Sequence, residues 1–452
     1  MNKCLALFFF AITTSLLNGC SLDNGSSAAP PNDLTATAGD GKVRVTWTAS
    51  SGVEYWLFSA TDAALTAFNW VSLPNAQVAI DAHSPFYLCG LPNGIPFYFA
   101  ANGRINGGPG GASSATVSGT PRFAGAAGTW IASDPSTDNL LGVGYVSLTT
   151  CSNPAISAAG GFAAVGANGA IFTSQTTDGL TPVTWTSGSV TGGFSTNLNA
   201  VAGYAANQNN PASPGLLWVA VGDGGATVTS TDGITWSVGT PYNSNSTANP
   251  TNQTLRAVIQ VGGTFLAVGD AGTILFSTDG ITWTARISNT TNNLRGITYG
   301  NGVYVAVGDN GTIRISADGI TWGTPTVPTL TDTLRQVSSV LTTLIAVGDN
   351  GTIVTSIDQG NTWIKQTTTA LGTPNFVGIA SHGVKYQHST LGEVTALEFL
   401  AIDSSGNYYI SPDGVAWTTA GISTGKPGLN GLISSGFGYV AAGNAGATVS
   451  AF

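Results

Sequence analysis

The chain has 452 residues with a net charge of −9, 61 glycines and only 8% charged residues. Aspartate outnumbers glutamate by 19 to 3, and this scarcity of helix-favouring residues argues against helical bundles and coiled coils. The acidic balance argues against nucleic acid as a partner, because phosphate binding needs a basic face. We therefore expect an all-β protein of short strands and tight turns, long enough for two or three domains.

The first nineteen residues have the pattern of a lipoprotein signal peptide. Lys3 gives a cationic start, and residues 5–17 form an apolar run that is too short to span a bilayer. The run ends in Leu-Asn-Gly-Cys at residues 17–20, which resembles a bacterial lipobox; an ordinary cleaved signal with an incidental cysteine is the alternative. The resemblance implies that Cys20 carries a lipid anchor, followed by a flexible tether over residues 20–31.

The residue after this cysteine is Ser21, where an aspartate would signal retention in the inner membrane. The resemblance therefore implies a cell-envelope lipoprotein of the outer membrane, attached through its lipid alone. Whether the protein faces the periplasm or the outside stays open, and a monomer is favoured. Cys89 and Cys151 remain in the mature chain and fall in different predicted domains. They form either a disulfide between the domains, in an oxidising compartment, or two free thiols.

Residues 32–121 show the short alternating strands of a β-sandwich. Apolar and polar residues alternate over residues 43–47 and again from Tyr55, which predicts strands with one buried face. Together with a Gly-Leu-Pro-Asn-Gly corner at residues 90–94, these strands resemble a fibronectin type III domain. Phe97 stands where that family usually has a tyrosine, so the corner hydrogen bond from a tyrosyl hydroxyl is not expected.

Residues 122–452 are built from a repeat of four predicted strands. In the clearest copy, strands cover residues 294–299, 303–308 and 312–316. An Asp-Asn-Gly turn at residues 309–311 favours the positive φ of a tight hairpin. A Ser-x-Asp-Gly-x-Thr-Trp corner then leads into the fourth strand.

The tryptophan of this corner recurs at intervals of 39 to 54 residues, which suits one four-stranded propeller blade. The six tryptophans are Trp185, Trp236, Trp283, Trp322, Trp363 and Trp417. These corners resemble the Asp-box repeats of sialidase-like propellers. The Val-Gly-Asp-x-Gly hairpins beside them are similar to those of the photosystem II assembly and stability factor family. The resemblance implies a β-propeller over most of residues 122–452.

Six corners leave a seventh blade to be completed. Residues 429–452 supply three strands, and an open propeller would expose unpaired strand edges. The Thr-Trp pair at residues 129–130 repeats the end of the corner motif at the start of the repeat region. We therefore predict seven blades, closed by pairing of the segment around Trp130 with the C-terminal strand near Phe452.

The corner aspartates are predicted to be structural, because an Asp side chain accepts hydrogen bonds from the backbone N–H groups of its own turn. They are Asp178, Asp232, Asp279, Asp318, Asp358 and Asp413. A second set lies in the hairpins between the second and third strands: Asp223, Asp270, Asp309 and Asp349. Turn chemistry explains this set too, with direct ligand contact as the alternative. We expect no metal ion and no cofactor.

Three arginines occupy the same place in consecutive blades. Arg256, Arg295 and Arg335 each follow a leucine at the start of a first strand, where Asn199 and Asn430 stand in two other blades. Because first strands are innermost, the guanidinium groups can converge at the channel mouth and bind a carboxylate or an acidic peptide. Alternatively, each arginine pairs with a neighbouring hairpin aspartate and ties blades together. The photosystem factor family has an arginine-rich patch for partner binding, so the resemblance adds some weight to ligand binding, although the residues themselves favour the pairing with aspartates.

We expect a non-catalytic binding or assembly protein that presents a rigid propeller face to a protein or peptide partner. The enzyme alternative is a sialidase-like glycoside hydrolase, which also needs a tyrosine nucleophile, an activating glutamate and an acidic aspartate. The chain's glutamates are Glu54, Glu393 and Glu398, and we assign no catalytic residue. An adhesive or structural envelope protein is the third possibility, since a propeller alone does not define a function.

Overall fold

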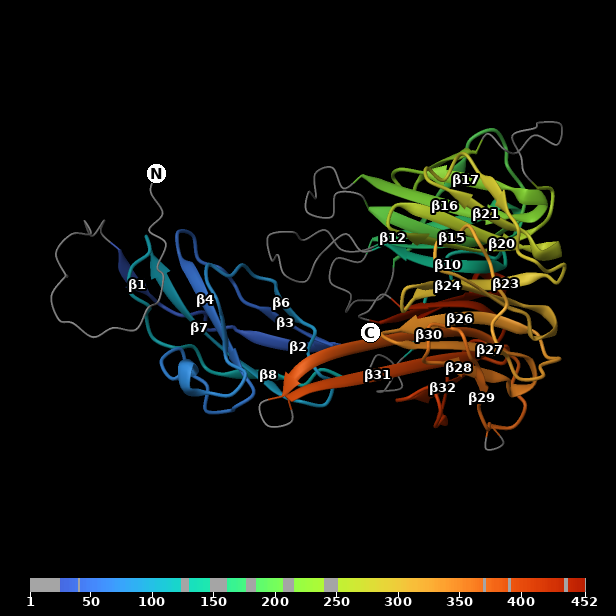
Figure 1. Ribbon diagram of the computed structural model, residues 1–452. Coiled ribbons are helices and arrows are strands. Elements are labelled where there is room, and N and C mark those ends of the chain that lie inside the picture. Colours follow the sequence, from blue (N-terminus) through green and yellow to red (C-terminus); the bar gives the residue numbers. More distant parts are fainter. Residues whose placement is uncertain are drawn as a thin grey trace.

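The computed structural model describes residues 25–39, 41–122, 130–146, 161–175, 184–205, 215–239, 251–368, 371–388, 392–434 and 438–451. The protein is all-β, with two sheets in an N-terminal sandwich and seven sheets in a ring (Figure 1). No helix in these residues is both long and apolar enough to cross a membrane. Among the residues singled out in the sequence, Lys3, Cys20, Ser21, Cys151, Asp178 and Phe452 lie outside the described ranges.

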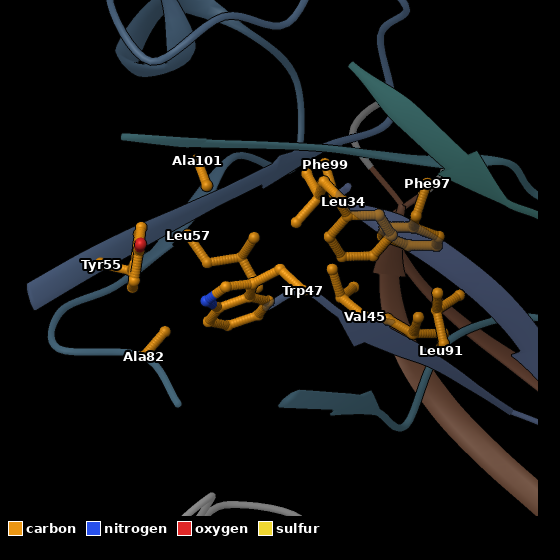
Figure 2. Packing of buried hydrophobic residues seen from close by; sticks show 11 residues of the cluster. Leu34, Val45, Trp47, Tyr55, Leu57, Ala82, Leu91, Phe97, Phe99 and Ala101 are labelled. Carbon is orange, nitrogen blue, oxygen red and sulfur yellow. The ribbon is translucent and has the colours of Figure 1, made fainter. Parts of the chain in front are cut away.

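The sandwich packs a five-stranded sheet against a three-stranded one. Their strands and one short helix are β1 (Ser26–Ala28), β2 (Thr35–Gly39), β3 (Lys42–Thr46), β4 (Glu54–Ala60), η1 (Trp70–Ser72), β5 (Gln77–Ala79), β6 (Phe86–Cys89), β7 (Phe97–Ile105) and β8 (Val117–Gly119). Trp47, directly after β3, lies edge-on to Tyr55 of β4 with ring centroids 5.9 Å apart, and both rings are buried (Figure 2). Aromatic and aliphatic burial between the sheets therefore provides the core of this unit.

The flexible tether expected over residues 20–31 is shorter in the structure. Ser26–Ala28 forms β1, which pairs antiparallel with β7, so that Ser26 lies opposite Ile105. The edge of β7 offers unpaired backbone groups, and pairing with β1 satisfies them. The sandwich consequently begins six residues earlier than residue 32.

Of the two cysteines expected in the mature chain, the structure shows that Cys89 forms a disulfide bond. Cys89 is at the end of β6 and lies opposite Lys42 of β3, in the three-stranded sheet of the sandwich. The other three cysteines of the chain lie outside the described residues, so Cys151 as the partner stays a prediction.

The ring consists of seven sheets, the blades, which are antiparallel except that the short strand Ser189–Val190 pairs in parallel in blade 2. Blade 1 contains β10 (Leu140–Val146), β11 (Gly161–Gly166), β12 (Ile171–Gln175) and β13 (Thr186–Ser187), and blade 2 contains β15 (Leu198–Ala205), β16 (Leu216–Gly222), β17 (Thr227–Ser230) and β18 (Thr235–Val238), joined by β14 (Ser189–Val190). Blade 3 contains β19 (Leu255–Val261), β20 (Thr264–Gly269), β21 (Ile274–Ser277) and β22 (Thr284–Arg286). Blade 4 contains β23 (Leu294–Gly300), β24 (Val303–Gly308) and β25 (Ile313–Ser316). The fourth strand predicted for blade 4 is reduced to one isolated bridge, between Ile315 and Gly323.

Blades 5 to 7 continue the pattern. Blade 5 contains β26 (Leu334–Val340), β27 (Thr343–Gly348), β28 (Ile353–Ser356) and β29 (Ile364–Lys365). Blade 6 contains β30 (Phe376–His388), β31 (Gly392–Asp403), β32 (Asn407–Ser411) and β33 (Thr418–Ser423). Blade 7 contains β34 (Leu429–Ser434), β35 (Tyr439–Gly443), β36 (Thr448–Ala451) and β9 (Ile131–Ala132). The β30–β31 hairpin is about twice as long as the first hairpins of the other blades, and Figure 1 shows it extending from the ring toward the sandwich.

The ring is closed by the segment that the sequence predicted. Ile131 of β9 lies opposite Ser450 of β36, and Ala132 lies opposite Val449. The first strands of consecutive blades contact one another, and β34 of blade 7 contacts β10 of blade 1. The structure is thus a closed seven-bladed propeller with its first strands around a central channel.

Candidate functional site

The mouth of the channel is a ring with one side chain from each blade. These seven residues surround a cavity of about 180 Å³, and we call them the mouth ring: Leu141, Asn199, Arg256, Arg295, Arg335, Val377 and Asn430. The five candidate residues predicted from the sequence therefore come together at one place. Leu141 and Val377 complete the ring and were not singled out in the sequence.

A bulge at the start of every first strand sets the direction of these side chains. The residue before each ring position is a buried leucine or, in blade 6, Phe376. Between that residue and the one two positions later, the pairing register shifts in all seven blades. The ring residue is the extra residue of the bulge, and such a residue is turned away from the regular alternation. Seven equal bulges therefore aim seven side chains at the channel mouth.

Each arginine of the ring is paired with the hairpin aspartate of its own blade. Arg335 donates Nε–H to Asp349 Oδ1 at 2.5 Å and Nη2–H to Oδ2 at 3.2 Å. Arg256 pairs in the same way with Asp270, and Arg295 with Asp309. The pairing prediction is therefore correct in its partners, but the pairs lie within blades and do not tie blades together. The reason is register, because the first hairpin brings residues fourteen apart side by side.

These ion pairs are half-exposed and leave part of each guanidinium available. The arginine side chains are between 27% and 39% exposed, and the aspartates between 21% and 24%. Burial opposes ionisation of Asp309, but hydrogen bonds and charge from Arg295 outweigh it and hold the pKa of Asp309 below its ordinary value. Within the described part of the chain, Nη1 of each ring arginine has no hydrogen-bond partner.

The two ring asparagines connect neighbouring blades. Asn199 Nδ2 donates to Asp223 Oδ1 in its own blade and to the carbonyl of Leu255 in blade 3, at 2.9 and 3.0 Å. Asn430 Nδ2 donates to Asn444 Oδ1 and to the carbonyl of Leu140 in blade 1. Because every partner of Nδ2 is an acceptor, the amide orientation is determined, and Oδ1 of both asparagines is left as an acceptor at the mouth.

Blade 6 departs from the arginine–aspartate pattern. Val377 takes the arginine's place and Ser404 takes the place of the hairpin aspartate, while Asp403, one residue earlier, is buried. Asp403 accepts hydrogen bonds from the backbone N–H groups of Ser405 and Asn407 and from the Tyr409 hydroxyl. Burial, together with this carboxylate, raises the pKa of Tyr409 to about 12. The ring thus has its cationic residues on blades 3, 4 and 5 only.

Below the mouth the channel holds about 430 Å³ and is lined by first strands from all seven blades. The next layer of side chains is small except for one: Gly142, Ala200, Ala257, Gly296, Gln336, Gly378 and Gly431. Gln336 of blade 5 accepts the N–H of Ile379 at 2.8 Å and donates to the carbonyl of Leu432 in blade 7 at 3.3 Å. The Gln336 side chain passes Gly378, where an added Cβ atom would lie 3.2 Å from Gln336 Oε1.

The corner aspartates lie within their own turns. Asp279 Oδ1 accepts the Ser277 hydroxyl and the backbone N–H groups of Ile281 and Thr282, at 2.7 to 2.9 Å. Burial opposes ionisation of Asp279, yet these hydrogen bonds hold its pKa below the ordinary value. The same geometry occurs at Asp232, Asp318 and Asp413, whereas Asp358 accepts the backbone N–H and the hydroxyl of Thr362 together with the Ser356 hydroxyl. Groups of acidic, histidine or cysteine residues able to hold a metal ion do not occur in the described ranges.

A second column of asparagines, not singled out in the sequence, joins consecutive blades beside the ring. Each stands one residue before the buried leucine or phenylalanine, and its Oδ1 accepts a backbone N–H from the hairpin turn of the preceding blade. They are Asn139, Asn197, Asn293 and Asn375. The only sequence signal is their constant place before the first strand.

Within the part of the propeller that the structure describes, one tyrosine is hydrogen-bonded to a glutamate. The Tyr439 hydroxyl donates to Glu398 Oε1 at 3.1 Å, and the two side chains are 0% and 4% exposed. The pair lies away from the mouth, because Glu398 is paired with His382, six residues along β30 from Phe376, and Tyr439 is paired with Ser434 at the far end of β34. This pair is therefore separated from the arginines and has no surface for a substrate.

No family model matches the chain, and no curated protein matches it. A structure of YCF48 bound to a D1 peptide matches with a TM-score of 0.52 at 17% identity, over 71% of this chain and 94% of that chain. YCF48 from Cyanidioschyzon merolae has a TM-score of 0.49 at 15% identity, over 71% and 98% of the two chains. Virginiamycin B lyase from Staphylococcus aureus has 0.49 at 11%, over 72% and 99%. The likeness to the first structure concerns the fold and agrees with a β-propeller.

Proposed function

We propose that the protein is a non-catalytic binding protein of the bacterial cell envelope, whose mouth ring holds a carboxylate-bearing segment of a protein partner. In this proposal Cys20 carries the lipid that anchors the chain to the outer membrane. The sandwich then stands between the membrane and the propeller. The partner is a protein or peptide, and neither metal nor cofactor takes part.

The observation that carries the proposal is the unpaired edge of three neighbouring guanidinium groups at one cavity. Nη1 of Arg256, Arg295 and Arg335 has no partner in the described part of the chain, although Nε and Nη2 are held by aspartates. Fixed arginines form stronger and more directional hydrogen bonds with carboxylates than mobile ones, because little side-chain freedom is lost on binding. A rigid ring of this kind suits recognition of a partner group.

The comparison with solved structures adds support from the fold. YCF48, a propeller with a TM-score of 0.52 to this chain, has been solved with a D1 peptide bound. A propeller of this size is thus able to hold a peptide. The D1 peptide itself is not carried over to this chain, since the identity is 17%.

The glycoside hydrolase alternative is weakened by the position of its required groups. Such an enzyme would need a tyrosine and a glutamate beside the arginines that hold the substrate. Here the Tyr439–Glu398 pair is buried between blades and lies away from the mouth. A panel of fluorogenic sialosides tests this alternative directly, and turnover that is lost in Arg295→Ala would restore it.

Affinity capture from the native envelope tests the proposal, with two variants that break the same ion pairs. The first carries Arg256→Gln, Arg295→Gln and Arg335→Gln, which removes the donors. The second carries Asp270→Asn, Asp309→Asn and Asp349→Asn, which leaves the donors and removes the negative charge and one acceptor oxygen of each competing side chain. We expect the first variant to lose the captured partner more than tenfold, because each lost hydrogen bond to a charged group costs about 1.5–3 kcal/mol.

The second variant is the matched control, because any loss of stability from broken ion pairs is common to both. It should retain the same partner or capture more of it. If both variants lose the partner equally, the ion pairs serve only the fold and the mouth ring is not the binding site. If both keep it, the partner binds elsewhere on the chain.

A further inference from the structure

The mouth ring is polarised. Going round the channel, the arginines occupy blades 3, 4 and 5, and the remaining four blades carry Val377, Asn430, Leu141 and Asn199. One side therefore offers hydrogen-bond donors. The other side offers two amide oxygens, Oδ1 of Asn199 and Asn430, and two aliphatic side chains.

Net charge does not favour a polyanion at this place. The four hairpin aspartates Asp223, Asp270, Asp309 and Asp349 outnumber the three ring arginines by one. A run of acidic residues would meet these carboxylates, which repel it at close range. Binding of an anion at the ring consequently depends on the direction of the Nη1–H bonds and not on net charge. A single carboxylate can accept these hydrogen bonds as well as several carboxylates could.

The narrow mouth opens into the wider channel, whose lining includes the same seven ring residues. About 180 Å³ at the mouth is only slightly more than the ~150 Å³ of a protein cavity that holds benzene, so the mouth itself accepts one small group. That space suits the end of a chain better than a continuous segment that must enter and leave. Directly below, Gln336 spans blades 5 to 7 and restricts further entry on that side.

The last residue of a peptide presents the groups that the ring complements. Its carboxylate accepts hydrogen bonds, its own N–H donates, and its side chain projects between them. A carboxylate on an Asp or Glu side chain is separated from its backbone N–H by additional methylene groups, and its chain continues in both directions. The amide oxygens opposite the arginines would then have no donor.

We propose that the mouth ring binds the free C-terminal carboxylate of a partner peptide, inserted end-on and ending in an aliphatic residue. The carboxylate bonds Nη1 of the three arginines, the terminal N–H bonds an asparagine Oδ1, and the last side chain contacts Leu141 or Val377. This inference rests on the proposed function and specifies the chemistry of its partner.

Fluorescence anisotropy with the purified full chain and labelled pentapeptides tests this inference. The first pair of probes is tetraglycyl-leucine with a free carboxylate and the same peptide as a C-terminal amide. Two further amides carry one central aspartate among glycines, or five consecutive aspartates. We expect the free acid to bind at least about tenfold more tightly than its amide and than both aspartate peptides, since a charged hydrogen bond contributes about 1.5–3 kcal/mol.

Arg295→Gln should abolish this preference, while Arg286→Gln removes the same charge outside the ring and should preserve it. Equal binding of acid and amide contradicts the end-on inference and leaves the proposed function standing. Tighter binding of either aspartate peptide contradicts it in favour of a side-chain carboxylate. If none of the four peptides binds, the inference falls, and the envelope capture experiment decides the proposed function separately.

Discussion

Among the corner aspartates that the structure describes, Asp358 has the most strongly lowered pKa. The Thr362 hydroxyl and backbone N–H and the Ser356 hydroxyl donate to it, against a small effect of burial, and they lower its pKa to about 2. A carboxyl group whose pKa is lower in the folded state stabilises the fold above its unfolded pKa. That contribution is lost as pH falls from about 4 toward 2.

We therefore predict that the melting temperature of Asp358→Ala lies below that of the parent at pH 7, and that the difference shrinks toward zero by pH 2. Thermal melts followed by circular dichroism across this pH range measure it. Asp358→Asn is the control, since it keeps one acceptor oxygen and removes the charge. It should retain part of the stability at pH 7 without this pH dependence. A constant difference at every pH would show that the carboxylate contributes no more than packing.

Individual residues also show where sequence reasoning succeeds and where it stops. A turn role for the corner aspartates can be inferred locally, because the donors lie within four residues of Asp279 or Asp358. The partner of Arg335 depends on the register between β26 and β27, which places Asp349 fourteen residues away beside it. Blade-to-blade bonds such as that from Asn199 to Leu255 depend on the closed ring and have no local signal.

At the scale of strands, the bulge at the start of each first strand determines the site. The repeat length and its turns predict the strands of a blade to within about a residue, as in β24 (Val303–Gly308). A bulge is a property of two paired strands, so the alternation within one strand does not predict it. The convergence of the arginines could be anticipated from their common position, but the seven-residue ring could not.

The closing strand β9 is short, so its stability should depend on the side chain beside it. Trp130 precedes β9 and packs on Tyr408 of β32, with ring centroids 5.7 Å apart, at the edge of the core between blades 6 and 7. We predict that Trp130→Ala lowers the free energy of unfolding by about 2–4 kcal/mol, because a large aromatic contact is lost.

Denaturant unfolding measures this change, and hydrogen exchange localises it. Protection should fall first in β36, the strand that pairs with β9. Ile364→Ala in β29 is a suitable control, since that side chain is 63% exposed and should change stability by less than about 0.5 kcal/mol. Equal effects of the two substitutions would contradict a special role of Trp130 in closing the ring.

For the whole molecule, the fold class and the number of blades follow from the sequence because repetition carries them. Each blade buries its apolar strands against the next, and the corner tryptophans mark that period. The sandwich and the propeller have separate cores: buried clusters contain either residues 34–117 or residues 130–449. Two separate cores imply two cooperative units whose coupling depends on covalent links.

We predict that the disulfide of Cys89 is such a link, with Cys151 as its partner. Cys4 and Cys20 belong to the expected signal and anchor, so Cys151 is the remaining thiol in the mature chain. A disulfide closing a loop of this length stabilises by about 4 kcal/mol when it restricts the unfolded chain. Peptide mapping without reduction should recover the two cysteines in one linked fragment.

Cys151→Ser should then leave Cys89 accessible to a thiol reagent and separate thermal unfolding into two transitions, one for each core. In the parent chain the link keeps the sandwich beside blade 1 as either unit unfolds, so the transitions should lie closer together. A disulfide-linked dimer in the parent would instead assign Cys89 to a second copy. A single transition in Cys151→Ser would show that contacts between the units, and not the disulfide, couple their unfolding.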